Sequence, residues 1–127
     1  MSTPNCVQEA DAGVETIAQI LAGIEGVRIL ETYGGGQGSR ASILMDYGKS
    51  VEEMTAFTQR LAKAFGAYRD PSLDPLESAR DMTRFLVEWT GDSRDPLILV
   101  EIRPDQLDEA ATIFRSVLGR EYGNGSK

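Results

Sequence analysis

The chain has 127 residues, a formal net charge of −7, no histidine and one cysteine. Its length and its 41% apolar content fit one globular domain. Without histidine the chain cannot form a Ser-His-Asp triad or a Cys-His pair. Cys6 alone cannot hold a structural zinc ion or close an internal disulfide. We therefore expect none of these catalytic sites, no metal and no cofactor.

The predicted domain spans residues 13–122, between flexible tails at 1–12 and 123–127. Its first element is a helix over residues 13–23, because apolar residues recur there at the spacing of one helix face. Glycines follow this segment, and they are expected to end the helix.

Two strands are predicted next, over residues 27–33 and 41–47, because apolar and polar side chains alternate there. The loop between them is too short for a parallel crossover, so the strands should form an antiparallel hairpin. In the first strand Val27, Ile29 and Tyr33 should share one face, because side chains alternate with a period of two.

A second helix is predicted to begin at Ser50, since Ser50 and Glu53 have the spacing of a capping box. Gly66 is the expected glycine at its C-terminal end. A connector rich in proline and aspartate follows. Within it, Asp74 is the expected N-cap of a short helix that carries Pro75 in its first turn.

Alternation predicts two further strands over residues 83–89 and 97–103. The second of these is apolar on both faces in its middle, which is typical of an interior strand. A last helix should begin with Asp105 as its N-cap and end at Gly119.

This order of elements predicts an α+β fold. We expect a four-stranded, mainly antiparallel sheet from two ββα units, with an N-terminal helix and with the helices packed on one face. A weak internal repeat of about 54 residues supports the two units, because Arg28 matches Arg84 and Tyr33 matches Trp89. The order of the strands does not follow from the sequence.

The loop from Gly34 to Arg40 is rich in glycine. Such a loop can turn its amide groups toward a phosphate, and Arg40 could bind that phosphate through two hydrogen bonds. Phosphate-binding loops lead into a helix, however, whereas this loop leads into a strand. The other interpretation is a hairpin tip in which glycine supplies a positive φ.

Aromatic and basic residues flank both hairpin loops. If the hairpins point the same way, these residues form a site for a partner or a ligand at one end of the sheet, because Tyr, Trp and Arg are enriched at binding hot spots. Otherwise the aromatic rings close the end of the core and the arginines are solvated. The candidates are Tyr33, Gly35, Arg40, Trp89 and Arg94.

Leucines are expected on the sheet face opposite the helices, where a strand facing water should carry mostly polar residues. Such a stripe indicates a surface for self-association or for a partner protein, unless the connector, residues 67–82, covers it. The candidates for this surface are Leu30, Leu44, Leu86, Leu97 and Leu99.

From these features we expect a small, acidic, non-enzymatic protein-binding module, such as an adaptor, an inhibitor or a chaperone-like protein, that forms a homodimer. Residues 70–112 carry 11 acidic and 4 basic side chains, which suits a partner with a basic surface. The chain has no Lys/Arg cluster for nucleic acid and no apolar run that could cross a membrane, so we expect a cytoplasmic protein that contacts neither.

Two other function classes stay open from the sequence. One is a regulatory domain that binds a small ligand or a phosphate through the loop from Gly34 to Arg40. The other is an enzyme that works with carboxylates, which would need a buried carboxyl group with a raised pKa.

Overall fold

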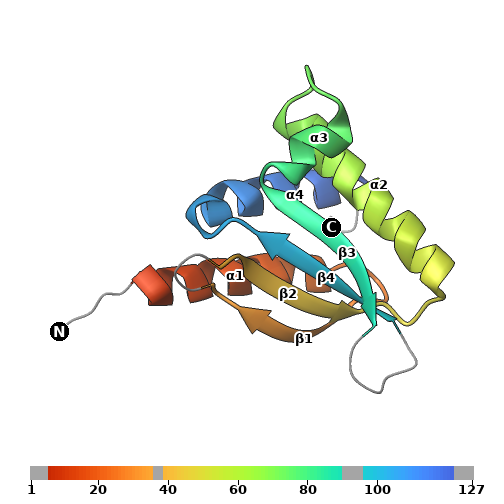
Figure 1. Ribbon diagram of the computed structural model, residues 1–127, viewed down its shortest axis with the longest axis horizontal. Coiled ribbons are helices and arrows are strands. Elements are labelled where there is room, and N and C mark those ends of the chain that lie inside the picture. The colour runs from red at the N-terminus through yellow and green to blue at the C-terminus, as the bar shows by residue number, and fades with distance from the viewer. Residues whose placement is uncertain (1–5, 36–38, 90–95, 122–127) are drawn as a thin grey trace.

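A computed structural model describes residues 6–35, 39–89 and 96–121. It confirms the α+β class: one antiparallel sheet of four strands has its helices packed on one face (Figure 1). The elements in chain order are α1 (Cys6–Ala22), β1 (Arg28–Tyr33), β2 (Ala41–Asp46), α2 (Val51–Arg69), α3 (Pro75–Arg80), β3 (Thr83–Trp89), β4 (Pro96–Ile102), a 3-10 turn (Pro104–Gln106) and α4 (Leu107–Glu121).

The strands lie in the order β1-β2-β4-β3, so β4 is an interior strand, as predicted. The two hairpins meet through β2 and β4, which run antiparallel to each other. A half-turn about an axis normal to the sheet therefore exchanges the two hairpins. It does not exchange the helices, because α2 packs against β3 whereas α1, and not α4, packs against β1. Leu44 pairs directly with Leu99 at this axis.

The half-turn also relates two ion pairs, one in each hairpin. Arg28 lies 3.1 Å from Asp46 across β1 and β2. Arg84 lies 3.8 Å from Glu101 across β3 and β4. The match of Arg28 with Arg84 in the sequence thus corresponds to equivalent places in the sheet, whereas Tyr33 lies at the place equivalent to Glu88 and not to Trp89.

The core lies between the sheet and the helices. Ile43, Met45, Ile98 and Val100 point inward from the two central strands and are fully buried. On the helix-covered face of the sheet, α1 packs against β1 and β2, and α2 packs against β3. α4 packs against α1 and α2. No helix within the described ranges is long and apolar enough to cross a bilayer.

A β-bulge interrupts β1. Ile29 pairs with Met45, but Glu31 pairs with Leu44, so Leu30 is an extra residue without a partner on β2. A bulge of this kind shifts every later side chain by one position and so reverses the face on which it lies.

The bulge makes the prediction for Tyr33 wrong. Beyond it Thr32 faces the helices, and its Oγ1 donates a hydrogen bond to Glu15 of α1 at 2.9 Å. Tyr33 pairs with Ser42 on the opposite face and is 52% exposed. It therefore does not share a face with Ile29.

The first and last helices differ from their predicted limits. α1 begins at Cys6, so part of the expected tail at residues 1–12 is helical. Asp105 lies inside the 3-10 turn and does not cap α4; it lies 3.6 Å from Arg103. α4 continues through Gly119 to Glu121, because an exposed glycine in a helix is tolerated at a cost of only about 1 kcal/mol.

The capping box predicted at the start of α2 is present. Glu53 N–H donates to Ser50 Oγ, and Ser50 N–H donates to Glu53 Oε1, both at 3.2 Å. Asp74 caps α3 in the predicted way, with its side chain accepting from two backbone N–H groups. Both signals involve residues close together in the chain, so tertiary packing does not alter them.

Gly66 is not the end of α2, in contrast to the prediction. The helix continues to Arg69, and Gly66 is buried within it. An added Cβ at Gly66 would lie 1.7 Å from the carbonyl oxygen of Pro75, so the glycine is where α3 approaches α2 most closely. Its role is contact between two helices and not termination of one.

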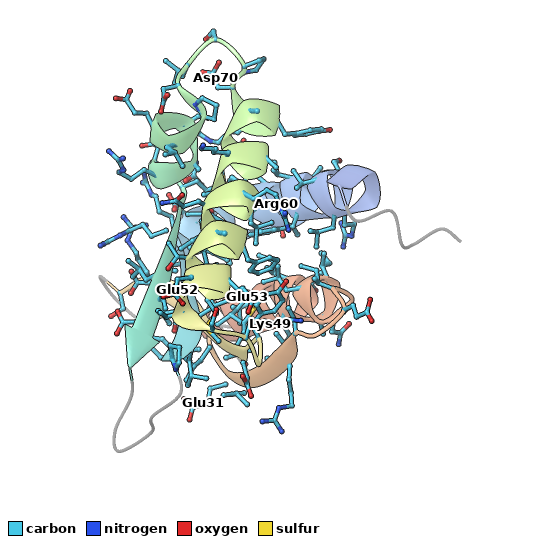
Figure 2. The ribbon with its side chains drawn as sticks, turned by 90° about the vertical axis from the view of Figure 1, so that its right-hand side faces the viewer. Glu31, Lys49, Glu52, Glu53, Arg60 and Asp70 are labelled. Atoms are coloured by element: carbon cyan, nitrogen blue, oxygen red, sulfur yellow. The ribbon has the colours of Figure 1, made fainter. Side chains whose placement is uncertain are left out.

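Replacement of Ser50 by alanine should destabilise the protein by about 1 kcal/mol at neutral pH, because one N-cap is lost. Glu53 lies in the first turn of α2 (Figure 2). The hydrogen bonds from the Ser50 backbone and then its side chain lower the pKa of Glu53 below its ordinary value of 4.5. The hydrogen bonds from Ser50 to the ionised carboxylate of Glu53 therefore stabilise the fold above pH 4.5. This stabilisation is lost as pH falls through the lowered pKa of Glu53.

Urea unfolding at neutral and acidic pH, with an NMR titration of the carboxyl groups, checks this prediction. In Ser50→Ala the pKa of Glu53 should rise toward its ordinary value. Ser72→Ala is the matched control, because the Ser72 side chain and backbone lower the pKa of Asp70 in the same way at the other end of α2. An unchanged pKa of Glu53 in Ser50→Ala would contradict the assignment.

Candidate functional site

The two hairpins point to opposite ends of the sheet, because β2 and β4 are antiparallel neighbours. Tyr33 and Arg40 flank the β1-β2 loop at one end. Trp89 ends β3 at the other end, where it pairs with Pro96. Arg94 lies outside the described residues. The site expected from both hairpin loops together is therefore not assembled.

The glycine loop follows β1. Gly34 is buried, and Gly35 has a φ of +86°, which agrees with the hairpin-tip interpretation. A Cβ at Gly35 would lie 3.1 Å from the nitrogen of Ala41, so the position needs glycine for space as well as for conformation. Residues 36–38 lie outside the described ranges.

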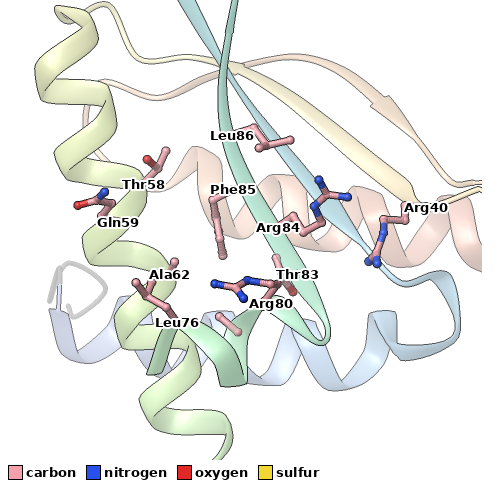
Figure 3. A pocket seen from close by; sticks show the side chains of 11 residues that line it. Arg40, Thr58, Gln59, Ala62, Leu76, Arg80, Thr83, Arg84, Phe85 and Leu86 are labelled. Atoms are coloured by element: carbon pink, nitrogen blue, oxygen red, sulfur yellow. The ribbon is translucent and has the colours of Figure 1, made fainter. Parts of the chain in front are cut away.

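A pocket of about 560 Å³ lies beside β3, between this strand and helices α2 and α3 (Figure 3). β3 lines it with every residue from Thr83 to Leu86. Side chains alternate between the faces of a strand, so four successive lining residues place the pocket along the outer edge of β3. Among the described residues this edge has no neighbouring strand, because β3 pairs with β4 alone.

Three arginines line this pocket: Arg40, Arg80 and Arg84. Arg84 has an acidic neighbour, Glu101, at 3.8 Å. Within the described part of the chain, Arg40 and Arg80 form no ion pair. The pocket therefore gathers positive charge on a chain whose net charge is −7.

Two polar groups at the pocket lack a hydrogen-bond partner among the described residues. One is Nη1 of Arg40, and the other is Oγ1 of Thr83, whose side chain is 1% exposed. A buried donor without a partner costs about 1–3 kcal/mol, and more if it is charged. Both atoms are buried, so a ligand in the pocket would contact them only if a side chain moved.

The face opposite the helices carries the predicted leucines. Leu44 pairs with Leu99, and Leu99 pairs with Leu86, so three strands form one apolar row. Leu97 is the next residue of β4 on this face, and Leu30 is 40% exposed in the bulge of β1. We call this set of five residues the leucine face.

The leucine face is separate from the core. Leu44, Leu86, Leu97 and Leu99 are half-buried, and none of the five leucines packs against the buried core cluster. The connector was the predicted alternative cover, but α3 packs against α2 and the start of β3, on the helix side. Within the described ranges, no element lies over the leucine face (Figure 1).

The sequence indicated the leucine face but not the pocket. Arg40 was a candidate because it follows the glycine loop, whereas Arg80 and Arg84 lie far along the chain on other elements. Only the pairing of β2, β4 and β3 brings the three together. The chain shows no match to the protein-family models, the curated proteins or the solved structures with which it was compared.

Proposed function

We propose that this chain is a small, acidic, non-catalytic protein-binding module that associates with a second copy of itself through the leucine face. The observation that carries the proposal is the row of Leu44, Leu99 and Leu86, which three neighbouring strands present on a face that no described element covers. The largest contiguous apolar patch on a protein surface is often a site of association.

The charges around the leucine face suit a two-fold dimer. Arg28 and Glu88 lie on the two outer strands, at the same end of the sheet. A two-fold axis that lies in the interface, parallel to the strands, places Arg28 of one copy opposite Glu88 of the other. This pair therefore occurs twice in the dimer. The same axis places Leu44 opposite Leu99, so like residues meet.

The size of the face sets the expected affinity. Four strands about 4.8 Å apart, with six or seven residues each and a rise of about 3.3 Å per residue, cover about 400 Å² in projection. A standard interface buries about 800 Å² per partner. We therefore expect a reversible dimer with a dissociation constant in the micromolar range, and not a permanent one.

Leu99→Glu should abolish this dimer while leaving the fold intact. The new carboxylate is hydrated in the monomer, because Leu99 is half-exposed, but it would be buried without a partner at the centre of the dimer. Burial of an unpaired charge costs about 3–5 kcal/mol, which corresponds to a loss of affinity of at least about 100-fold. Light scattering and sedimentation across the micromolar range measure the change.

Leu73→Glu is the matched control. Leu73 is 48% exposed, but it lies in the turn between α2 and α3, on the far side of the helices from the leucine face. The Leu73→Glu variant should dimerise like the wild type. A wild type that stays monomeric, or a Leu99→Glu variant that dimerises as well as Leu73→Glu, would contradict the proposal.

A charge swap tests the register of the dimer. Arg28→Glu and Glu88→Arg should each weaken dimerisation by placing like charges opposite each other, and the double variant should restore it. If the double variant is weaker than both single variants, the copies do not meet about the axis described here.

A further inference from the structure

The outer edge of β3 is a second surface, which shares Leu86 with the leucine row but extends away from it toward α2 and α3. We propose that it binds an extended, acidic segment of a partner protein, which adds to the sheet as a fifth strand. The inference rests on the protein-binding role proposed above and names a partner chemistry for a different part of the molecule.

The backbone of β3 is suited to accept a strand. All seven residues pair with β4 in an unbroken register, from Thr83 opposite Ile102 to Trp89 opposite Pro96. Within the part of the chain that the structure describes, the N–H and C=O groups on the other side of β3 have no strand to pair with. Such groups form a regular ladder to which an extended peptide can add.

The pocket supplies space and chemistry beside this ladder. On the helix side of β3 the wall has an apolar part, formed by Ala62 from α2, Leu76 from α3 and Phe85. Beside it, α2 and α3 add polar side chains: Thr58, Gln59 and Arg80. Figure 3 shows Arg40 and Arg84 on the other side of the strand. Alternate side chains of an added strand would enter these two regions, so apolar residues alternating with carboxylates fit the pocket.

Charge favours an acidic segment at this edge. Carboxylates would pair with the guanidinium of Arg40, which lines the pocket and forms no ion pair among the described residues, and they would add to the distant contact that Glu101 makes with Arg84. Hydrogen bonds between guanidinium and carboxylate groups are about twice as strong as neutral ones. The rest of the surface, which gives the chain its net charge of −7, would repel the same segment and so restrict it to the pocket.

A synthetic peptide of alternating valine and glutamate, as long as β3 and with blocked ends, is the probe. Fluorescence anisotropy should show binding to the wild type, and Arg40→Ala and Arg84→Ala should each weaken it about tenfold, as expected for loss of a charged hydrogen bond. Arg115→Ala removes an exposed arginine of α4 and should leave binding unchanged. No binding, or equal binding to all these variants, would overturn the inference.

A second arm separates strand addition from simple capture of anions. A peptide methylated at alternate backbone nitrogens keeps its charges but cannot complete the ladder, so it should bind at least tenfold more weakly. Hydrogen exchange should slow at amides of Thr83–Trp89 when the unmodified peptide binds. If the methylated peptide binds equally well, the pocket is an anion site and the inference fails. The same conclusion follows if inorganic phosphate displaces the peptide at a phosphate concentration as low as the dissociation constant of the peptide.

The peptide and dimer experiments fail independently. Leu99 does not line the pocket, so the monomeric Leu99→Glu variant should bind the peptide as the wild type does. A chain that binds the peptide but never dimerises would contradict the proposed dimer alone. A chain that dimerises but does not bind the peptide would contradict the inference alone.

Discussion

Gly66→Ala is expected to lower the free energy of unfolding by about 3 kcal/mol, at the upper end of the usual penalty for overpacking. The new methyl group would lie 1.7 Å from the carbonyl oxygen of Pro75 and 3.0 Å from the nitrogen of Ala79. Both atoms belong to the backbone of α3 and cannot rotate away, so α3 must move from α2. The higher helix propensity of alanine, about 1 kcal/mol, offsets only part of this cost.

Gly119→Ala is the matched control for this prediction. Gly119 also lies inside a helix, but an added Cβ meets nothing within 4 Å. This variant should be more stable than the wild type by about 0.5–1 kcal/mol, because alanine replaces an exposed glycine. Urea unfolding followed by circular dichroism measures both variants. Equal effects of the two substitutions would show that α3 does not approach α2 as described.

Phe114→Ala should destabilise the protein by about 4 kcal/mol, the usual loss when a buried phenylalanine is reduced to alanine. Phe114 is fully buried, and its ring centre lies 4.9 Å from that of Phe65 and 6.1 Å from that of Phe85. The three rings join α4, α2 and β3, so the cavity would lie where these elements meet. The surrounding backbone is regular and can collapse only in part.

Phe85→Ala should cost clearly less than Phe114→Ala, because Phe85 is half-buried at the wall of the pocket and water already reaches its ring. Equilibrium unfolding in urea gives both free energies, and an unchanged m-value shows that the same surface is exposed on unfolding. If the two variants lose the same stability, the three rings do not form the closed cluster described here.

Features set by neighbouring residues could be predicted from the sequence. The capping box of Ser50 and Glu53 and the Asp74 cap each use groups at most three positions apart, and both are present. The alternation that predicted four strands also placed Leu44, Leu86 and Leu99 on the face away from the helices. These signals survive folding because burial of one strand face fixes which side chains point inward.

Features set by distant residues could not be predicted. Gly66 carries the usual mark of a helix end, and only the return of α3 explains why it lies inside the helix. The extra residue at Leu30 leaves no mark in the alternating pattern, yet it turns Tyr33 to the other face. The arginine pocket depends on strand order, which hydrophobic spacing does not determine.

The bulge at Leu30 also makes the two edges of the sheet unequal. A sheet that is open at both edges can take up strands on each side and grow into a fibre. Here the ladder of β1 is broken at the bulge, whereas the ladder of β3 is continuous. The regular edge of β3 is therefore better suited to accept an added strand than the edge of β1. The extra residue in β1 thus disfavours growth of the sheet in both directions.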